Sequence, residues 1–311
     1  MNEPGWERKV LEKVALESIA EQRRRRRWGI FFKLLGFAYL AALFAAFGGW
    51  GGAERLADGK DHTALVQLNG VIQAKDEANA ENMITGLQSA FEDKGTKGVV
   101  LQINSPGGSP VQAGMIRDEI VRLRKKYPAI PLYVVVEDIC ASGGYYVAVA
   151  ADKIYVDKAS IVGSIGVLMD GFGFTGTMEK LGVERRLLTA GNNKGMLDPF
   201  SPQSAEQKAY ALGMLDEIHR QFIEVVRQGR GKRLKETPET FSGLMWIGAK
   251  SIELGLADAF GTTESVARDV IKAEDILDYT VKPNFAEQFA RKFGASMAEG
   301  AASIVTRFSL R

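Results

Sequence analysis

The chain has 311 residues, of which 46% are apolar and 25% charged, a composition typical of folded proteins rather than of disordered segments. The 40 lysines and arginines nearly balance the 38 aspartates and glutamates, and the net charge of +2 provides no field that would hold a nucleic-acid backbone. We therefore expect one large or two small folded domains and no nucleic-acid partner. One cysteine and two histidines are also too few to build a structural zinc site without carboxylates, so no metal is expected.

The first 53 residues divide into a basic segment and an apolar segment. Residues 1–27 carry eight basic and five acidic side chains and end in the run Arg23–Arg27. Residues 28–53 contain a single charge, Lys33, and the uncharged part corresponds to about 30 Å of helix. This length predicts a transmembrane helix over 28–53, and the flanking arginines predict a cytoplasmic N-terminus. A cleaved secretory signal is the alternative, although its apolar region is usually shorter.

Beyond the apolar segment, short apolar strands alternate with amphipathic helices. Strands are expected over 64–68, 98–103, 132–136, 153–156 and 184–189. Helices are expected over 80–91, 111–127, 145–150 and 202–228, with an exposed loop over 190–203, short helices around a turn over 243–273 and an amphipathic tail over 285–308. Strands that alternate with helices of this length predict an α/β domain with right-handed crossovers.

Two glycine loops follow directly after buried strands. The first contains Gly108, and the second begins at Ser142 and continues with Gly143. In an open α/β sheet both loops would lie along the carboxyl edge, where ligands bind. If Ser142 begins a helix, its hydroxyl can attack a carbonyl while the N–H groups of Gly108 and Gly143 stabilise the oxyanion, by roughly 3–4 kcal/mol per donor. Taken alone, a Ser-Gly-Gly sequence is more often a helix cap beside a flexible turn.

The histidines and the cysteine are weaker candidates. His62 lies close to the predicted membrane segment and His219 flanks the apolar stripe of a helix, so a structural role is favoured for both. Cys140 is expected to be a small buried side chain at a strand end rather than a second nucleophile, because no cation precedes it to lower its pKa.

Three motifs in this order resemble the signal peptide peptidase A family, also called protease IV, within the Clp-protease and crotonase superfamily. They are Asn104–Gly108, Ala141–Tyr146 and Gly163–Val167, and the resemblance covers about residues 64–280. It implies a sheet built from repeated β-β-α units, with Ser142 as the nucleophile. It also implies that the base is a lysine about fifty residues further along the chain.

Lys194 matches the position of that base, because it lies 52 residues after Ser142 in a polar loop. Lys180, in a helix pattern, and Lys158, at a strand end, are expected to be solvated surface charges. A free lysine titrates near 10.4, so a lysine that acts as a base near pH 7 needs desolvation in an apolar cleft. The resemblance gives Ser164 the role of orienting the amine; the alternative is a simple turn serine.

The resemblance therefore implies a serine endopeptidase that needs no cofactor, and the apolar segment 28–53 predicts that it is anchored in the cytoplasmic membrane by a single span. Its substrates would be remnant signal peptides and other extended apolar peptides. It would form a homo-oligomeric ring in which neighbouring subunits contribute Ser142 and Lys194, so that a single protomer keeps the two side chains apart. The expected organisation is a cytoplasmic segment 1–27, the transmembrane helix, an extracytoplasmic peptidase domain 54–281 and a helical tail 282–311.

Two other functions remain open from the sequence. A crotonase-like acyl-thioester enzyme would use the same glycine loops as an oxyanion hole without a serine nucleophile. A membrane-anchored scaffold would keep the fold and lack the chemistry. Replacing Ser142 by alanine separates the first alternative from a peptidase, and labelling with a serine-directed fluorophosphonate separates the second.

Overall fold

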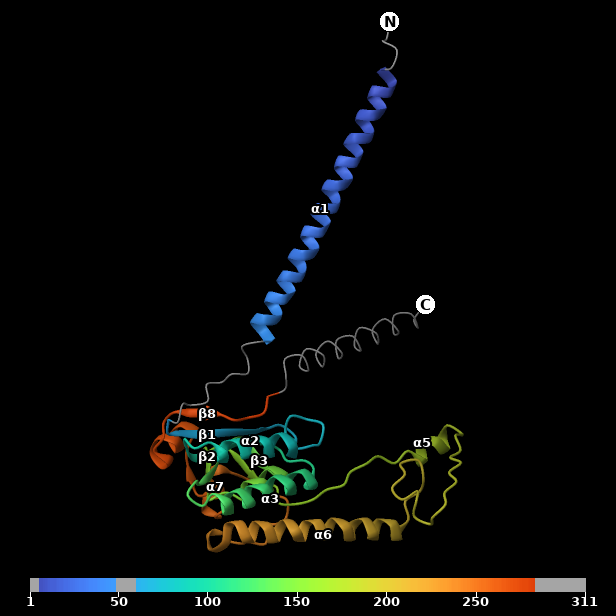
Figure 1. Ribbon diagram of the computed structural model, residues 1–311. Coiled ribbons are helices and arrows are strands. Elements are labelled where there is room, and N and C mark those ends of the chain that lie inside the picture. Colours follow the sequence, from blue (N-terminus) through green and yellow to red (C-terminus); the bar gives the residue numbers. More distant parts are fainter. Residues whose placement is uncertain (1–5, 49–59, 283–311) are drawn as a thin grey trace. The chain divides into compact units, whose positions relative to one another are not determined.

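The computed structural model describes residues 6–48 and 60–282, in two units (Figure 1). One unit contains the helix α1 (Trp6–Gly48), and the other spans Ala57–Lys282 and holds all the remaining described elements. The predicted amphipathic tail over 285–308 lies outside the described residues.

The membrane span predicted over residues 28–53 is not confirmed by the structure. Helix α1 includes residues 28–48 of that segment, and the last five residues lie outside the described part of the chain. Within residues 6–48 and 60–282, no helix combines the length and the apolar character that crossing a bilayer requires.

The second unit is built on an eight-stranded sheet with the order β6-β5-β3-β2-β1-β8, in which β4 pairs with both β3 and β7. All pairs are parallel except β5 with β6. The strands are β1 (His62–Asn69), β2 (Thr96–Ser105), β3 (Leu132–Ala141), β4 (Lys153–Val156), β5 (Ile161–Gly163), β6 (Met245–Ile247), β7 (Ala259–Phe260) and β8 (Ile276–Asp278). The α/β class predicted from the sequence is confirmed.

The central strands are apolar along their length because both faces of the sheet are covered. Val99, Val100 and Leu101 of β2 are all fully buried, as expected for a parallel strand between two layers. The larger core cluster packs under the helices, whereas Val100 belongs to a smaller cluster that contains Val135 and Val266. The sheet is therefore a rigid support whose strand ends can position loops.

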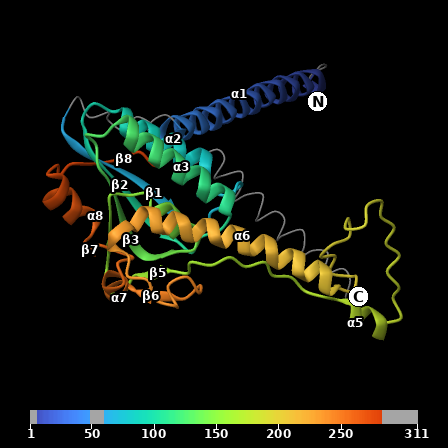
Figure 2. The same ribbon diagram turned by 90° about the horizontal axis from the view of Figure 1, so that it is seen from below.

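The helices begin where the sequence provides N-caps or glycine turns. Asn79, Ser109 and Ser204 each accept a hydrogen bond from a backbone N–H in the first turn of the following helix. The helices are α2 (Ala80–Glu92), α3 (Pro110–Lys126), α4 (Gly143–Ala148), α5 (Thr175–Lys180), α6 (Ala205–Arg230), α7 (Gly248–Glu253) and α8 (Thr263–Ser265), with a 3₁₀ turn Gly231–Arg233 and a π-helical turn η2 (Val266–Ile271). Figures 1 and 2 show α3 and α6 along the same side of the sheet.

The strand predicted over 184–189 is wrong. These residues have no regular structure and are exposed, and they belong to a segment that we call the arm, residues 168–203. Figures 1 and 2 show that the arm, which carries α5, extends away from the sheet near the first turn of α6. A strand needs a neighbour for its backbone hydrogen bonds, and the sheet is too far from the arm to provide one.

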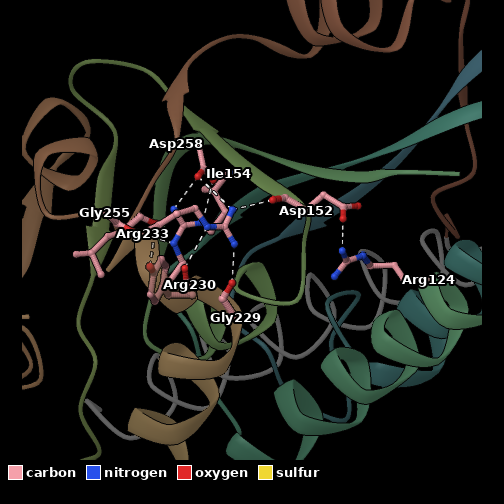
Figure 3. A network of polar contacts seen from close by, with 10 residues as sticks. Arg124, Asp152, Ile154, Gly229, Arg230, Arg233, Gly255 and Asp258 are labelled. Atoms are coloured by element: carbon pink, nitrogen blue, oxygen red, sulfur yellow. Dashed lines mark hydrogen bonds and ion pairs between the residues drawn. The ribbon is translucent and has the colours of Figure 1, made fainter. Parts of the chain in front are cut away.

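The last turn of α6 is fixed to the sheet by a buried ion pair (Figure 3). Arg230, only 1% exposed, donates from Nη1 and Nη2 to the two carboxylate oxygens of Asp258, both at 2.9 Å, and from Nε to the Gly255 carbonyl at 2.7 Å. Burial would raise the pKa of Asp258, but hydrogen bonds from Arg230 and Ile154 and the nearby charges hold that pKa below its ordinary value. The contact fixes the end of α6 against the sheet.

Candidate active site

The sheet brings the three sequence motifs to one edge. Ser105 of β2 pairs with Cys140 of β3, and Ala141 of β3 pairs with Gly163 of β5. Because these strands are parallel, their carboxyl ends lie side by side, and the loop that follows each strand meets the others. The arrangement predicted for the glycine loops is therefore present.

Ser142 occupies a sharp turn between β3 and α4. It is the N-cap residue of α4, but its hydroxyl makes no capping hydrogen bond, and its N–H donates to the Gly163 carbonyl at 2.9 Å. Its φ of 51° lies in a region that costs a non-glycine residue about 1–3 kcal/mol. The sequence-based expectation that Ser142 begins a helix is confirmed, and its hydroxyl is left free of the local cap.

Two backbone N–H groups lie close together beside this serine. A Cβ added to Gly143 would lie 3.2 Å from the Gly108 nitrogen, so the two amides are close neighbours. The N–H of Gly107 donates to Ser105 Oγ at 3.1 Å and is therefore engaged. In the part of the chain that the structure describes, the N–H groups of Gly108 and Gly143 have no acceptor. These two donors can bind an oxyanion.

The loop that carries Gly108 requires glycine for steric reasons. Gly107 has a φ of 102°, and a Cβ there would lie 2.6 Å from the Gly143 nitrogen. At Gly108 a Cβ would lie 2.2 Å from the Ile72 carbonyl oxygen, because Ile72 forms a bridge with this loop. Only glycine allows both approaches, which place the loop against the turn at Ser142.

Ser142 opens into a cavity of about 540 Å³. Four of the predicted site residues line it: Gly108, Ser142, Gly143 and Ser164. The remaining wall is largely apolar and is formed by the loop after β2, by α3 and α4, by the loop after β5 and by α6. Its apolar residues are Pro106, Pro110, Ala113, Tyr146, Val167, Leu168, Ile218 and Phe222. The cavity suits an extended apolar ligand beside a hydroxyl nucleophile.

The two tyrosines that follow Gly144 have different roles. Tyr145 is fully buried, and its hydroxyl donates to the Leu256 carbonyl at 2.8 Å. Tyr146 lines the cavity, its ring centroid lies 5.1 Å from that of Phe222, and partial burial raises its pKa. Tyr145 is therefore structural, and Tyr146 forms part of the cavity wall.

Ser164 lies in the loop after β5 with a φ of 52°. Its N–H donates to the Leu244 carbonyl at 2.7 Å, and its carbonyl accepts from the N–H of Gly166 at 2.9 Å. The side chain is half-buried and faces the cavity. It could therefore orient a group that enters the cavity beside Ser142.

Lys194 does not reach the cavity within the single chain. It lies on the arm, is exposed, and its backbone N–H donates to the Gly191 carbonyl at 3.1 Å. The cavity-lining residues of the described chain include no lysine, and Lys158 and Lys180 are also exposed elsewhere. The structure thus brings together Ser142, Gly108, Gly143 and Ser164 and leaves Lys194 apart.

The remaining candidates are structural. Cys140 is fully buried, and burial raises the pKa of its thiol, which keeps it protonated and unreactive. His62 is also fully buried, and its ring nitrogens contact the Lys60 carbonyl at 2.9 Å and the Tyr279 hydroxyl at 3.0 Å, away from the cavity. The structural interpretations of both residues are confirmed.

The contribution of α6 to the cavity was not predicted from the sequence. Ile218, Gln221 and Phe222 line it, together with Ser242 and Gly243 from the segment before β6. The apolar stripe of α6 was visible in the sequence. Its periodicity marked a buried face, which does not distinguish a core contact from a cavity wall.

Comparison with known proteins identifies relatives among peptidases. The model of peptidase family S49 matches residues 124–276. A putative signal peptide peptidase SppA of Enterococcus faecium is 32% identical over 238 residues, which cover 73% of this chain and 69% of that protein. A putative protease of Methanocaldococcus jannaschii is 33% identical over 217 residues, 68% of each chain.

Another relative is much longer than this chain and is named as an antiporter. A Na⁺/H⁺ antiporter NhaA of Brucella abortus is 46% identical over 186 residues, which cover 58% of this chain and 25% of that protein. The chain thus spans about a quarter of the length of this relative. The matches to these two putative peptidases, which extend over more than two thirds of each of those proteins, and the family model establish that the chain belongs to peptidase family S49, the signal peptide peptidase A family.

Proposed function

We propose that this chain is a serine endopeptidase in which Ser142 is the nucleophile and Lys194 the general base. The observation that carries the proposal is the free hydroxyl of Ser142 at a strained turn, beside the unengaged N–H groups of Gly108 and Gly143 in one cavity. A nucleophile and two oxyanion donors at the carboxyl edge of a sheet are the parts that acyl transfer requires.

In the proposed reaction, Ser142 Oγ attacks the carbonyl carbon of the scissile peptide bond while its proton passes to the neutral amine of Lys194. The carbonyl oxygen becomes an oxyanion, which the N–H groups of Gly108 and Gly143 stabilise by about 3–4 kcal/mol per donor. The resulting ammonium then protonates the leaving amine, so that the C–N bond breaks and an acyl-enzyme forms. Water, deprotonated by the same amine, hydrolyses the ester and restores the hydroxyl of Ser142.

The lysine is proposed to come from a neighbouring copy of the chain. Lys194 is exposed on the arm, and a lysine that acts as a base needs a desolvated position, which the single chain does not give it. The arm also exposes large apolar side chains, with Phe172 and Leu188 at 81% and 96% exposure. Such side chains favour burial against a partner. Docking of the arm on the next subunit of a ring would bury them and would desolvate Lys194 in the cavity beside Ser164.

The proposed substrates are extended apolar peptides such as remnant signal peptides. The apolar walls formed by Tyr146, Phe222 and Ile218 support this proposal, since they offer no charged partner to a substrate side chain. The Enterococcus relative carries the name of a putative signal peptide peptidase, which points in the same direction.

Attachment to the cytoplasmic membrane, with the N-terminus inside and the peptidase domain outside, is proposed from the sequence alone. The support is the run Arg23–Arg27 followed by the largely uncharged residues 28–53. Extraction of membranes with alkaline carbonate tests this part: full-length protein that stays in the pellet agrees with a span, and full release into the supernatant contradicts it.

The catalytic assignment is tested with the variant Ser142→Ala and a fluorophosphonate probe. Wild-type oligomer should cleave an apolar peptide and should form an adduct at Ser142, and the Ala variant should do neither. Cleavage that survives in a folded Ser142→Ala variant would exclude the serine mechanism. An acyl-thioester activity that survives there would instead favour a crotonase-like enzyme, and wild-type protein that neither cleaves peptides nor forms the adduct would favour a scaffold.

A further inference from the structure

The loop after β5 is held from three directions. The Gly163 carbonyl accepts from the N–H of Ser142 at 2.9 Å, and the N–H of Ser164 donates to the Leu244 carbonyl at 2.7 Å. The third contact comes from a side chain: His219 Nε2 of α6 lies 3.1 Å from the Ile165 carbonyl oxygen. Two contacts are thus made by backbone groups, and the third depends on the identity of residue 219.

This third contact joins two walls of the cavity. Ile165 lies between Ser164 and Gly166, which both line the cavity. His219 lies between Ile218 and Phe222 on α6, which line it from the other side. The hydrogen bond therefore fixes the spacing between the loop that carries Ser164 and the helix that forms the apolar wall.

The chemistry of the contact defines what His219 can do. A carbonyl oxygen only accepts, so Nε2 must carry a proton and donate it. Nε2 is therefore engaged as a donor and is not free to remove a proton from a substrate. His219 is half-buried, and Ile165 has a fully buried side chain that anchors the loop on its inner side. Loss of the His219 donor would free the Ile165 carbonyl, while the buried Ile165 side chain would still anchor the inner side of the loop.

We propose that His219 is a positioning residue that holds the loop after β5, and with it the Ser164 hydroxyl, at the correct distance from α6. The inference rests on the proposed function, in which Ser164 orients the lysine amine. Without the His219 contact the loop can move away from α6. The base would then be misplaced, while the apolar wall formed by Ile218 and Phe222 would remain.

The matched pair His219→Gln and His219→Met tests this role. The two new side chains have nearly the same length, but only glutamine carries an N–H that can donate to the Ile165 carbonyl. The full-length oligomer should show about a tenfold lower kcat for the Met variant, with KM within about twofold, because a typical hydrogen bond contributes 0.5–1.5 kcal/mol. The Gln variant should stay within about threefold of wild-type kcat, and the rate of fluorophosphonate labelling of Ser142 should follow kcat. The variant Arg220→Met, at the exposed neighbouring position of α6, should be unchanged.

Oligomeric state and thermal unfolding are measured for every variant. Equal kcat for the wild type and the Met variant would overturn the proposal, and so would equal losses for Met and Gln, since a purely structural effect does not depend on the donor. If the Met variant does not fold, His219→Ala takes its place against His219→Gln with the same expectations. Failure here would leave the Ser142 assignment intact, because that assignment is tested by the loss of all cleavage in Ser142→Ala.

Discussion

Gly107 lies directly against Ser142: a Cβ added at position 107 would stand 2.7 Å from the Cβ of Ser142. The approach is possible because the loop after β2 passes the turn between β3 and α4 with a φ of 102° at Gly107. The position of the Gly108 and Gly143 N–H groups relative to Ser142 thus depends on the absence of a side chain at position 107.

Gly107→Ala should therefore abolish peptide cleavage. The added methyl group must displace either the loop or the serine turn, and a displacement of about 1 Å at reacting groups can cost a hundredfold in rate. Gly114→Ala provides a matched control in α3, where a Cβ would meet nothing within 4 Å and alanine favours the helix. The measurement is kcat/KM on an apolar peptide, together with thermal unfolding. Activity of Gly107→Ala equal to that of Gly114→Ala would contradict the assigned geometry.

A shared dyad predicts complementation between two inactive variants. Ser142→Ala and Lys194→Ala should each be inactive alone. After dissociation and mixed reassembly, an interface that combines Ser142 from one subunit with Lys194 from its neighbour should be restored in about a quarter of random pairings. Cleavage by the mixed oligomer measures this.

A dyad within one chain gives a different result for the same mixture. No subunit would then carry both groups, and the mixture would stay inactive. Wild-type protein that is dissociated and reassembled in the same way shows that reassembled sites are active, and native mass spectrometry of the mixture shows that subunits exchange. An inactive mixture next to an active control would rule out the shared dyad.

Leu188→Glu should weaken oligomer formation and reduce cleavage in parallel. Leu188 is 96% exposed on the arm, where the proposed assembly would bury it, and burial of an unpaired carboxylate costs several kcal/mol. Analytical ultracentrifugation and peptide cleavage measure the two effects. Val121→Glu, at an exposed position on α3, is the control and should leave both unchanged. A stable, active oligomer of Leu188→Glu would exclude the arm from the interface.

Strands with long apolar runs can be predicted from the sequence. Strands that form only because a neighbouring strand offers hydrogen bonds cannot be predicted in this way. Strands β2, β3 and β4 were expected because continuous runs of branched side chains mark buried parallel strands. Strands β5 to β8 have only two or three residues, too few for any periodicity, and they exist because a neighbouring strand offers hydrogen bonds. Residues 184–189 show the reverse: their composition permits a strand, but the arm offers no partner.

The residues of the candidate site also fall into those that could be predicted from the sequence and those that could not. Ser142, Gly108, Gly143 and Ser164 could be predicted because each belongs to a short motif at a strand end, and parallel pairing brings strand ends together. The contribution of α6 could not be predicted, because Phe222 has the periodicity of a core residue and lies in the wall of the cavity. Which face of a helix lines a cavity depends on the loops opposite it, and a single helix pattern does not contain that information.

The ion pair of Arg230 with Asp258 should make a large contribution to stability. Asp258→Ala would leave a guanidinium that is 1% exposed without its carboxylate, and breaking a buried pair in this way typically costs about 3–5 kcal/mol. The free energy of unfolding from urea titrations at pH 7 measures the loss. Asp269→Ala removes the partner of Arg268 in an exposed pair and should cost less than about 1 kcal/mol. Equal losses for the two variants would contradict the buried pair.

The same pair predicts how stability depends on pH. The folded pKa of Asp258 lies below its ordinary value of 3.8, because the hydrogen bonds and charges of its arginine partners outweigh burial. A carboxylate with a lowered folded pKa contributes stability that is fully present above the unfolded pKa and is lost as the pH falls through the folded pKa. The difference in unfolding free energy between the wild type and Asp258→Asn should therefore be constant from about pH 5 to pH 8 and should shrink below about pH 4. Asp269→Asn, at the exposed pair, should differ little from the wild type throughout. A wild-type advantage over Asp258→Asn that persists undiminished at pH 2 would show that the charge of Asp258 is not the source of the stability.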